Sequence, residues 1–387
     1  MISSTADGLY LGLISGTSAD SIDAALIDFG RGAPEVQGTL AHPWPTALRE
    51  RMLALAQDEA ALDLDAYGRL DVEVGHHFAD AALALLKQCS VSAEAVRAIG
   101  SHGQTLRHRP TGRYPFTLQL GDPTVIAERC GIDVVADFRR ADIAAGGQGA
   151  PLLPALHAML LTQPGQTRVV LNLGGIANIT VLAADGGVLG FDTGPANGLL
   201  DAWCLRHSGE PFDRDGTFAA SGKIDTPLLD ALLADPYFAL PPPKSTGREY
   251  FHLNWLASHP RMAALEPADV QATLLELTAR SVTAAIAEQA PHSTDVLTCG
   301  GGTHNGALMQ RLRELLAPRG VCSTAEHGID ADFLEATAFA WLARQRLLNL
   351  PGNLPAVTGA RGPRVLGAIY LAPPVPEPPA RIVSGAS

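Results

Sequence analysis

The stretch from Leu9 to Asp28 constrains the fold of this chain more than any other. An apolar run, Leu9 to Ile14, is long enough for a buried strand. A polar segment follows, and then Ile22, Ala24 and Leu26 alternate with Asp23, Ala25 and Ile27, a period of two that is typical of a second strand. The stretch therefore predicts a β-hairpin whose turn, Ser15 to Ser21, is small and rich in hydroxyl groups.

The same plan returns about one domain length later. Val169 to Leu173 is again an apolar strand, Gly174 and Gly175 form the turn, and Asn178 to Leu182 is the second strand. A further turn leads to a third strand, Val188 to Phe191. The repetition predicts two similar α/β halves, each offering a hairpin turn to one cleft.

Composition bounds the function class. The 387 residues are 47% apolar, which suits two globular domains, and the net charge of −12 argues against a general nucleic-acid or anionic-membrane surface. The five cysteines are scattered without zinc spacing, so we expect reduced thiols in a cytoplasmic protein. We also expect no signal peptide and no membrane span, because no basic region precedes the first apolar run and no run reaches about 18 residues.

The first turn is a candidate phosphate cradle. Gly16 lets the backbone approach a ligand, and successive amides in such a turn can point at one anion. An ordinary hairpin turn of Gly, Ser and Asp explains the same residues equally well. No lysine follows Gly16, which excludes a Walker loop, and a strand in place of a helix excludes a dinucleotide fingerprint.

Polar segments at predicted strand ends are further candidates. Ser101 to Thr105 follows the predicted strand Val96 to Gly100, and its His102 reads either as a ligand group or as a satisfied loop histidine. Ala144 to Pro151, AAGGQGAP, is too rich in glycine for an element interior and could be a hinge or a ligand loop. Arg139 precedes it and could bind a carboxylate or phosphate, or form a surface salt bridge.

Three more candidates lie in the second half. Asp192 follows a predicted strand and could carry chemistry or cap the helix that Pro195 opens. Gly300 to Gly302 follow a strand and would let a flat ligand, such as an adenine, lie against the backbone. The loop 241–249 carries Lys244 and Arg248 and could be a lid, a phosphate contact or a surface linker.

The three glycine turns, in this order, resemble the acetate and sugar kinase, heat-shock chaperone and actin superfamily. Within it the chain is similar to the anhydro-N-acetylmuramic acid kinase family, through blocks that span most of its length. The blocks are GTSADSID (16–23), SHGQT (101–105), ADFRRADIAAGGQGAPLLP (136–154), LNLGGIANIT (171–180), GFDTGPAN (190–197), PPPKSTGREYF (241–251), CGGGTHN (299–305) and FLEATAFAWLA (333–343).

The resemblance implies an α/β fold with two ribonuclease-H-like domains, mixed sheets flanked by helices and an ATP cleft between them. The expected domains are 1–140, with 364–375 as a candidate for return to it, and 141–363, followed by a loose tail, 373–387. The resemblance also implies ATP and Mg²⁺, a sugar substrate and a cytoplasmic homodimer, with no nucleic-acid or membrane partner.

The implied reaction belongs to peptidoglycan recycling. In 1,6-anhydro-N-acetylmuramic acid O6 is tied to C1, so no free hydroxyl is available for phosphorylation. Water must open the ring at C1 while O6 takes the γ-phosphoryl group of ATP. A carboxylate must deprotonate that water, as in an inverting glycosidase, and phosphate cradles with a divalent ion must offset the charge on the transferring group.

The resemblance assigns roles to individual residues. Asp192 matches the catalytic base, and Asp20 is the candidate near the metal or phosphates. Arg139 suits the lactyl carboxylate of the sugar. The residues implied for ATP are Gly16, Thr17, Ser18, Ala19, Asp20, Ser21, Ile22, Asp23, Gly174, Gly175, Asn178, Gly300, Gly301, Gly302 and Asn305. Those implied for the sugar are His102, Gln104, Arg139, Gln148, Gly194, Pro195, Asn197 and Glu335.

The chain departs from the family pattern at two places. The first turn usually reads GTSMDG, and here Ala19 and Ser21 replace Met and Gly; Leu334 and Thr337 replace the usual lysine and leucine around Glu335. Serine is strained where glycine supplies a positive φ. Two other functions stay open: a kinase for another anhydro sugar, and an actin-like ATP-binding scaffold without sugar chemistry.

Overall fold

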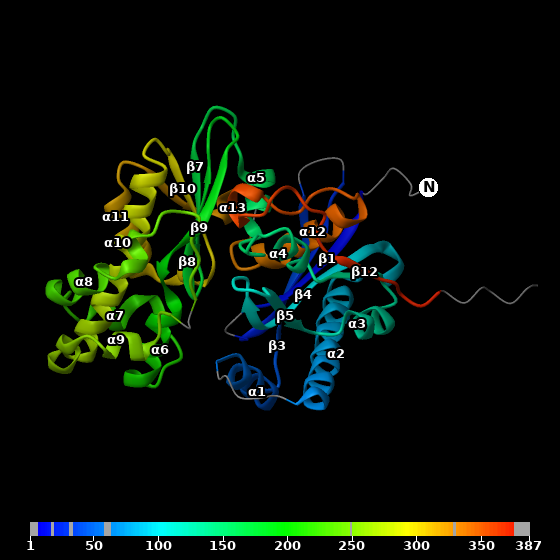
Figure 1. The fold of residues 1–387 in the computed structure, drawn as a ribbon, viewed down its shortest axis with the longest axis horizontal. Coiled ribbons are helices and arrows are strands. Elements are labelled where there is room, and N and C mark those ends of the chain that lie inside the picture. Colours follow the sequence, from blue (N-terminus) through cyan, green and yellow to red (C-terminus); the bar gives the residue numbers. More distant parts are fainter. Residues whose placement is uncertain are drawn as a thin grey trace, which may run out of the picture.

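Two mixed sheets flanked by helices make up the molecule (Figure 1). The computed structural model describes residues 7–16, 19–30, 34–57, 63–247, 250–327 and 330–374. The predicted α/β class is confirmed.

The first sheet is built around the predicted N-terminal hairpin. Strands β1, β2 and β3 form an antiparallel meander, while β4 and β6 lie parallel to β1 on its other side, in the order β12-β6-β4-β1-β2-β3 with β5 paired to β4. The strands are β1 (Leu9–Ser15), β2 (Ser21–Asp28), β3 (Glu35–Pro43), β4 (Val96–Arg109), β5 (Phe116–Leu120), β6 (Val134–Ala136) and β12 (Ala368–Tyr370).

The second sheet repeats this plan. Its order, β11-β10-β7-β8-β9, is again an antiparallel meander followed by parallel neighbours. The shared order is that of a ribonuclease-H-like domain, so the duplication inferred from the two glycine turns is confirmed. The strands are β7 (Arg168–Leu173), β8 (Ile176–Leu182), β9 (Val188–Pro195), β10 (Asp295–Cys299) and β11 (Gly320–Ser323).

The longest helices cover residues 64–89 and 267–289. None of the helices that the described residues form is long and apolar enough to cross a membrane. The helices are α1 (Thr46–Gln57), α2 (Leu64–Cys89), α3 (Pro123–Cys130), α4 (Arg140–Ala144), α5 (Leu153–Leu161), α6 (Asn197–Ser208), α7 (Thr217–Ala220), α8 (Thr226–Leu233), α9 (Leu253–Ala257), α10 (Pro267–Gln289), α11 (Gly306–Leu316), α12 (Leu334–Leu347) and α13 (Pro355–Thr358).

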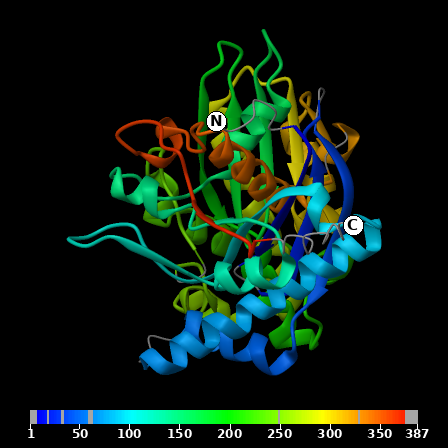
Figure 2. The same ribbon diagram turned by 90° about the vertical axis from the view of Figure 1, so that its right-hand side faces the viewer.

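Helix α12 lies between the two sheets (Figures 1 and 2). One apolar core joins its residues to strands of both sheets, among them Tyr10 and Val170. The helix touches the first sheet through backbone, because a Cβ added at Gly12 would lie 1.8 Å from the carbonyl oxygen of Ala336. The same addition at Gly100 would lie 1.9 Å from the carbonyl oxygen of Phe339. Only glycine permits this approach.

Three sequence expectations need correction. Ser101 to Thr105 is not a loop at a strand end, because β4 runs on to Arg109 and pairs with β5. Asp192 does not follow its strand, since β9 continues to Pro195. That proline ends the strand, and helix α6 begins only at Asn197. Both strands are longer than their apolar runs because backbone pairing continues through polar residues.

We propose the predicted boundary near residue 140 between the two domains. Strand β12 pairs antiparallel with β6, which supports the return of 364–375 to the first domain. Helix α12, which the prediction gave to the second domain, packs closely on β1 and β4.

Candidate functional site

The turn between β1 and β2 is held from outside by an arginine. Arg49 on α1 donates from Nε to the carbonyl oxygen of Ala19, at 2.9 Å, and from a terminal nitrogen to Oδ1 of Asp20, at 2.7 Å. The Asp20 side chain is nevertheless 68% exposed. Thr17 and Ser18 lie outside the described residues. Arg49 thus holds the backbone at Ala19, while the Asp20 side chain remains exposed.

The strained position of this turn is Ala19. Its φ is +48°, whereas Ser21 begins β2 without a positive φ. Replacing the family's glycine by Ser21 therefore introduces no backbone strain. Instead, the Ser21 hydroxyl donates to Oδ1 of Asp23 at 2.6 Å.

The second glycine turn is wrapped by the start of α6. The amides of Ala196 and Gly198 donate to the carbonyl oxygen of Gly175, at 3.2 and 3.0 Å. The amide of Asn197 donates to the carbonyl oxygen of Gly174, at 3.1 Å. The Asn197 side chain donates to the carbonyl oxygen of Leu173, at 2.9 Å. Asn197 therefore shapes this turn.

The third glycine segment closes on the second turn. Gly300 has φ +82°, and a Cβ added there would lie 2.3 Å from Oδ1 of Asn172. A Cβ added at Gly302 would lie 2.6 Å from the Cβ atom of Leu173. Gly301 is exposed with open space around it, as a flat ligand requires. Asn305 accepts from the amide of Leu308 at 3.0 Å and caps α11, a structural role for a residue assigned to ATP.

Asp192 belongs to a polar row across the second sheet. Asn172 lies opposite Asn178, which lies opposite Asp192, with a β-bulge beside Asn178. Opposed residues share a face. Gly190, on this same face of β9, lies against Pro154, so the row faces the layer between the sheets.

A segment at the free edge of β9, residues 241–247, holds Asp192; we call it the strap. The amide of Thr246 donates to Oδ2 of Asp192 at 2.9 Å, and the amide of Asp192 donates to the carbonyl oxygen of Lys244 at 3.1 Å. The N-cap of α6 is Ala196. The alternative that Asp192 caps this helix is therefore wrong.

His102 and Arg139 form a direct pair. Nε of Arg139 donates to Nε2 of His102 at 2.9 Å, and a terminal nitrogen donates to the carbonyl oxygen of Gly149 at 2.7 Å. Burial lowers the pKa of Arg139 to about 10 against the raising effect of the Glu335 and Asp142 charges, so the guanidinium stays charged at neutral pH. Arg139 therefore bonds to His102 and Gly149 instead of a surface carboxylate, and it is a half-buried cation beside the glycine loop.

The glycine loop 144–151 is organised by Asp142, which is fully buried. Its Oδ2 accepts from the amide of Gly149 at 2.7 Å, and its Oδ1 accepts from Asn353 and Thr358, at 2.6 and 2.7 Å. Gln148 in turn accepts from the hydroxyl of Ser245 at 2.9 Å, so the loop touches the strap.

Two more carboxyl groups belong to this region: Glu335 on α12 and Asp23 on β2. Burial raises the pKa of Glu335, helped by the Asp23 charge and opposed by Arg139. Burial also raises the pKa of Asp23, against the hydrogen bond from Ser21. Gln104 donates to the carbonyl oxygen of Gly16 at 3.1 Å and keeps a buried Oε1 without a partner.

The structure thus brings most predicted residues into one connected set. Gly194 and Pro195 lie apart from it, against Phe238 and the hydroxyl of Thr278. Sequence reasoning missed residues that hold the others through backbone or buried bonds: Arg49, Asp142, Tyr237, Ser245 and Thr246. Of these, only the last two lie in a motif that it singled out as a loop.

A divalent ion finds few ligands in the protein. Among the described residues, no three His, Cys, Asp or Glu side chains gather as a metal site. Mg²⁺ in phosphoryl-transfer sites is held by one or two carboxylates together with substrate phosphates and water. The exposed carboxylate of Asp20 fits that pattern.

Comparison with known proteins agrees with these features. A family model described as anhydro-N-acetylmuramic acid kinase matches residues 8–372. A curated protein of that name from Xanthomonas campestris pv. campestris (strain 8004) is 57% identical to this chain, over 94% of this chain and 97% of the relative. The protein from Xylella fastidiosa shares 54%, over 94% and 96%, and that from Coxiella burnetii shares 50%, over 93% and 97%.

Proposed function

The chain belongs to the anhydro-N-acetylmuramic acid kinase family, and on that premise we propose how its residues open and phosphorylate the anhydro sugar. The chain is a phosphotransferase of that specificity. Its membership decides against the scaffold alternative. The recycling of peptidoglycan is the setting that the substrate implies.

We propose Asp192 as the general base. It takes a proton from water, the water oxygen bonds to C1, and the bond from C1 to O6 breaks. O6 keeps that electron pair and accepts the γ-phosphoryl group, while the bond from this group to ADP breaks. Asp192 suits the task because the Thr246 amide occupies one carboxylate oxygen, which leaves the carboxylate oriented.

ATP is the proposed donor, with its phosphates at the turns 16–20 and 174–175 and its adenosine over Gly301. Mg²⁺ is the proposed ion: Asp20 would hold it together with phosphates and water, and it would offset charge on the phosphoryl group. Arg139 is proposed to bind the lactyl carboxylate, since a guanidinium matches a carboxylate geometrically. We further propose a cytoplasmic homodimer.

One observation carries the assignment of the site. Asp192 lies directly opposite Asn178, three residues beyond Gly175. The base and a phosphate turn therefore belong to one β-meander, and a sugar that touches both would place C1 and O6 between them.

The deciding experiment measures ADP release with Mg-ATP, with and without 1,6-anhydro-N-acetylmuramic acid, followed by the product mass. We expect sugar-dependent ADP and a product heavier by one phosphate and one water. Phosphate without water would remove the hydrolytic role from Asp192. Levoglucosan, which lacks the lactyl and N-acetyl groups, tests specificity, and a preference for it would remove the role proposed for Arg139.

A further inference from the structure

We propose that Tyr237 and Lys244 are positioning residues that act through Asp192, an inference that rests on the proposed function. Neither is part of the glycine turns, and the sequence leaves the loop of Lys244 open as a lid, a phosphate contact or a surface linker. Both contact the backbone of Asp192, on the edge strand of the second sheet.

Three hydrogen bonds hold Asp192 from this side. The Tyr237 hydroxyl donates to its carbonyl oxygen at 2.7 Å, its amide donates to the carbonyl oxygen of Lys244 at 3.1 Å, and the Thr246 amide donates to its carboxylate at 2.9 Å. The backbone of Asp192 is thus fixed independently of its carboxylate. Burial, with the Asp192 charge, raises the pKa of Tyr237, so its hydroxyl remains a donor.

Lys244 ties the strap to the turn that carries Tyr237. Its ammonium donates to the carbonyl oxygens of Tyr237 and Phe238, at 3.1 and 3.2 Å, and lies 4.7 Å from the centre of the Tyr237 ring. The strap, the turn 236–239 and β9 are therefore each hydrogen-bonded to the other two. Removing either side chain loosens the strap, although Thr246 itself is unchanged.

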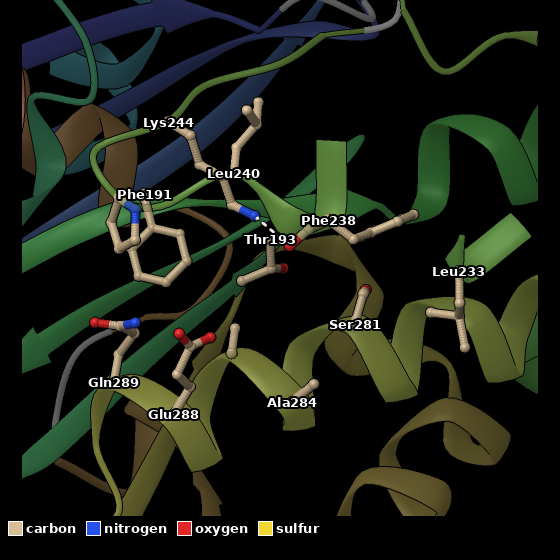
Figure 3. Close-up of a pocket in the computed structure, with 12 residues that line it drawn as sticks. Phe191, Thr193, Leu233, Phe238, Leu240, Lys244, Ser281, Ala284, Glu288 and Gln289 are labelled. Atoms are coloured by element: carbon tan, nitrogen blue, oxygen red, sulfur yellow. Dashed lines mark hydrogen bonds between the residues drawn. The ribbon is translucent and has the colours of Figure 1, made fainter. Parts of the chain in front are cut away.

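The Lys244 side chain lies away from the proposed sugar site. Figure 3 shows it beside Phe191 and Thr193, at a pocket that residues of α10 also line. These two residues flank Asp192 in β9, and successive side chains in a strand face opposite sides. Lys244 therefore lines the far face of the sheet, and it reaches Asp192 only through backbone.

The test compares Tyr237→Phe and Lys244→Met with Gln289→Ala, which alters the same pocket but removes none of the hydrogen bonds described above for the strap. We expect each of the first two to lower kcat about 10-fold, within the range that a small misplacement of a catalytic group produces, with both KM values within twofold. Gln289→Ala is expected to match the unaltered enzyme. Melting temperatures show whether each variant is folded.

A second arm repeats both substitutions in Asp192→Asn. If the two residues act through Asp192, they lower kcat no further there. Equal losses in both backgrounds, or full kcat in Tyr237→Phe and Lys244→Met, would overturn the inference while leaving Asp192 in place. A near-normal rate for Asp192→Asn alone would instead overturn the proposed function.

Discussion

Arg139 donates its Nε hydrogen to Nε2 of His102 across 2.9 Å. Nε2 must therefore accept, so the imidazole proton lies on Nδ1 and is donated to the carbonyl oxygen of Gly103, at 2.9 Å. Burial, reinforced by the Arg139 charge, holds the pKa of His102 well below its usual range. The neutral ring orients Arg139 without competing for an anionic ligand.

Arg139→Lys is expected to raise KM for the sugar about 10- to 100-fold, the worth of a charge-assisted hydrogen bond, with KM for ATP within twofold. Steady-state ADP release at varied sugar checks it. Arg140→Lys, in the neighbouring exposed ion pair with Asp137, is the control. An unchanged sugar KM would take the lactyl carboxylate away from Arg139.

Asp192→Asn is expected to lower kcat by about 10²- to 10⁴-fold, the usual worth of a positioned base. ATP affinity, measured by calorimetry, is expected to stay within twofold because Asp192 is not placed at the phosphates. Asp230→Asn, an exposed change on α8, should leave both quantities unaltered. A kcat within threefold of normal contradicts the assignment.

Asp142→Asn is expected to destabilise the protein by about 2–4 kcal/mol, because an amide nitrogen would replace an oxygen that accepts a buried hydrogen bond. The bonds at risk come from Gly149, Asn353 and Thr358. Urea unfolding measures the loss, and Asp65→Asn, on a side chain that is 85% exposed, is the matched change. Equal stability of the two variants would refute the anchoring role.

His157 predicts acid sensitivity. The side chain is fully buried, and burial lowers its pKa to about 3. Because the unfolded histidine has a pKa of about 6.5, the unfolded state binds the extra proton between these values. Stability is therefore fully present above about pH 6.5 and falls as the pH drops, by about 2 kcal/mol at pH 5 from this residue.

The measurement is the free energy of unfolding from pH 8 to 5 for His157→Gln. We expect a shallower pH dependence than in the unaltered protein. His292→Gln, at an exposed position, should keep the original slope. If the free energy of unfolding of His157→Gln depends on pH as steeply as that of the unaltered protein, the buried ring is not the source of the acid sensitivity.

Gly12→Ala is expected to cost about 3 kcal/mol or more, beyond ordinary overpacking, because the added carbon meets the backbone of α12. Gly68→Ala is expected to have the opposite effect on the stability of the folded protein. Gly68 lies inside α2 with nothing within 4 Å of an added Cβ, so alanine should stabilise the protein by about 1 kcal/mol. Thermal melts of the two variants that shift in one direction would contradict this.

The sequence predicts the strand pairs around the first two glycine turns because period and turn chemistry are local, but it gives no expectation of β3 or β11. It misplaces the ends of β4 and β9, where Ser101 to Thr105 and Asp192 stay in a sheet through pairing with distant strands. It cannot show that Asp142 reaches Asn353, since such a bond depends on the completed fold. Residue chemistry alone suggests a flat ligand at Gly301 and an anion at Arg139; the resemblance names ATP and the lactyl carboxylate, and the structure adds the surroundings of both residues.

Helix α12 meets β1 and β4 backbone to backbone at Gly12 and Gly100. At these two positions no side chain separates helix from strand, so we expect α12 to move together with β1 and β4. Glu335, at the first turn of α12, must travel with the β1–β2 turn, whereas Asp192 travels with β9. We therefore expect the separation of these two carboxyl groups to change whenever the first sheet moves relative to the second.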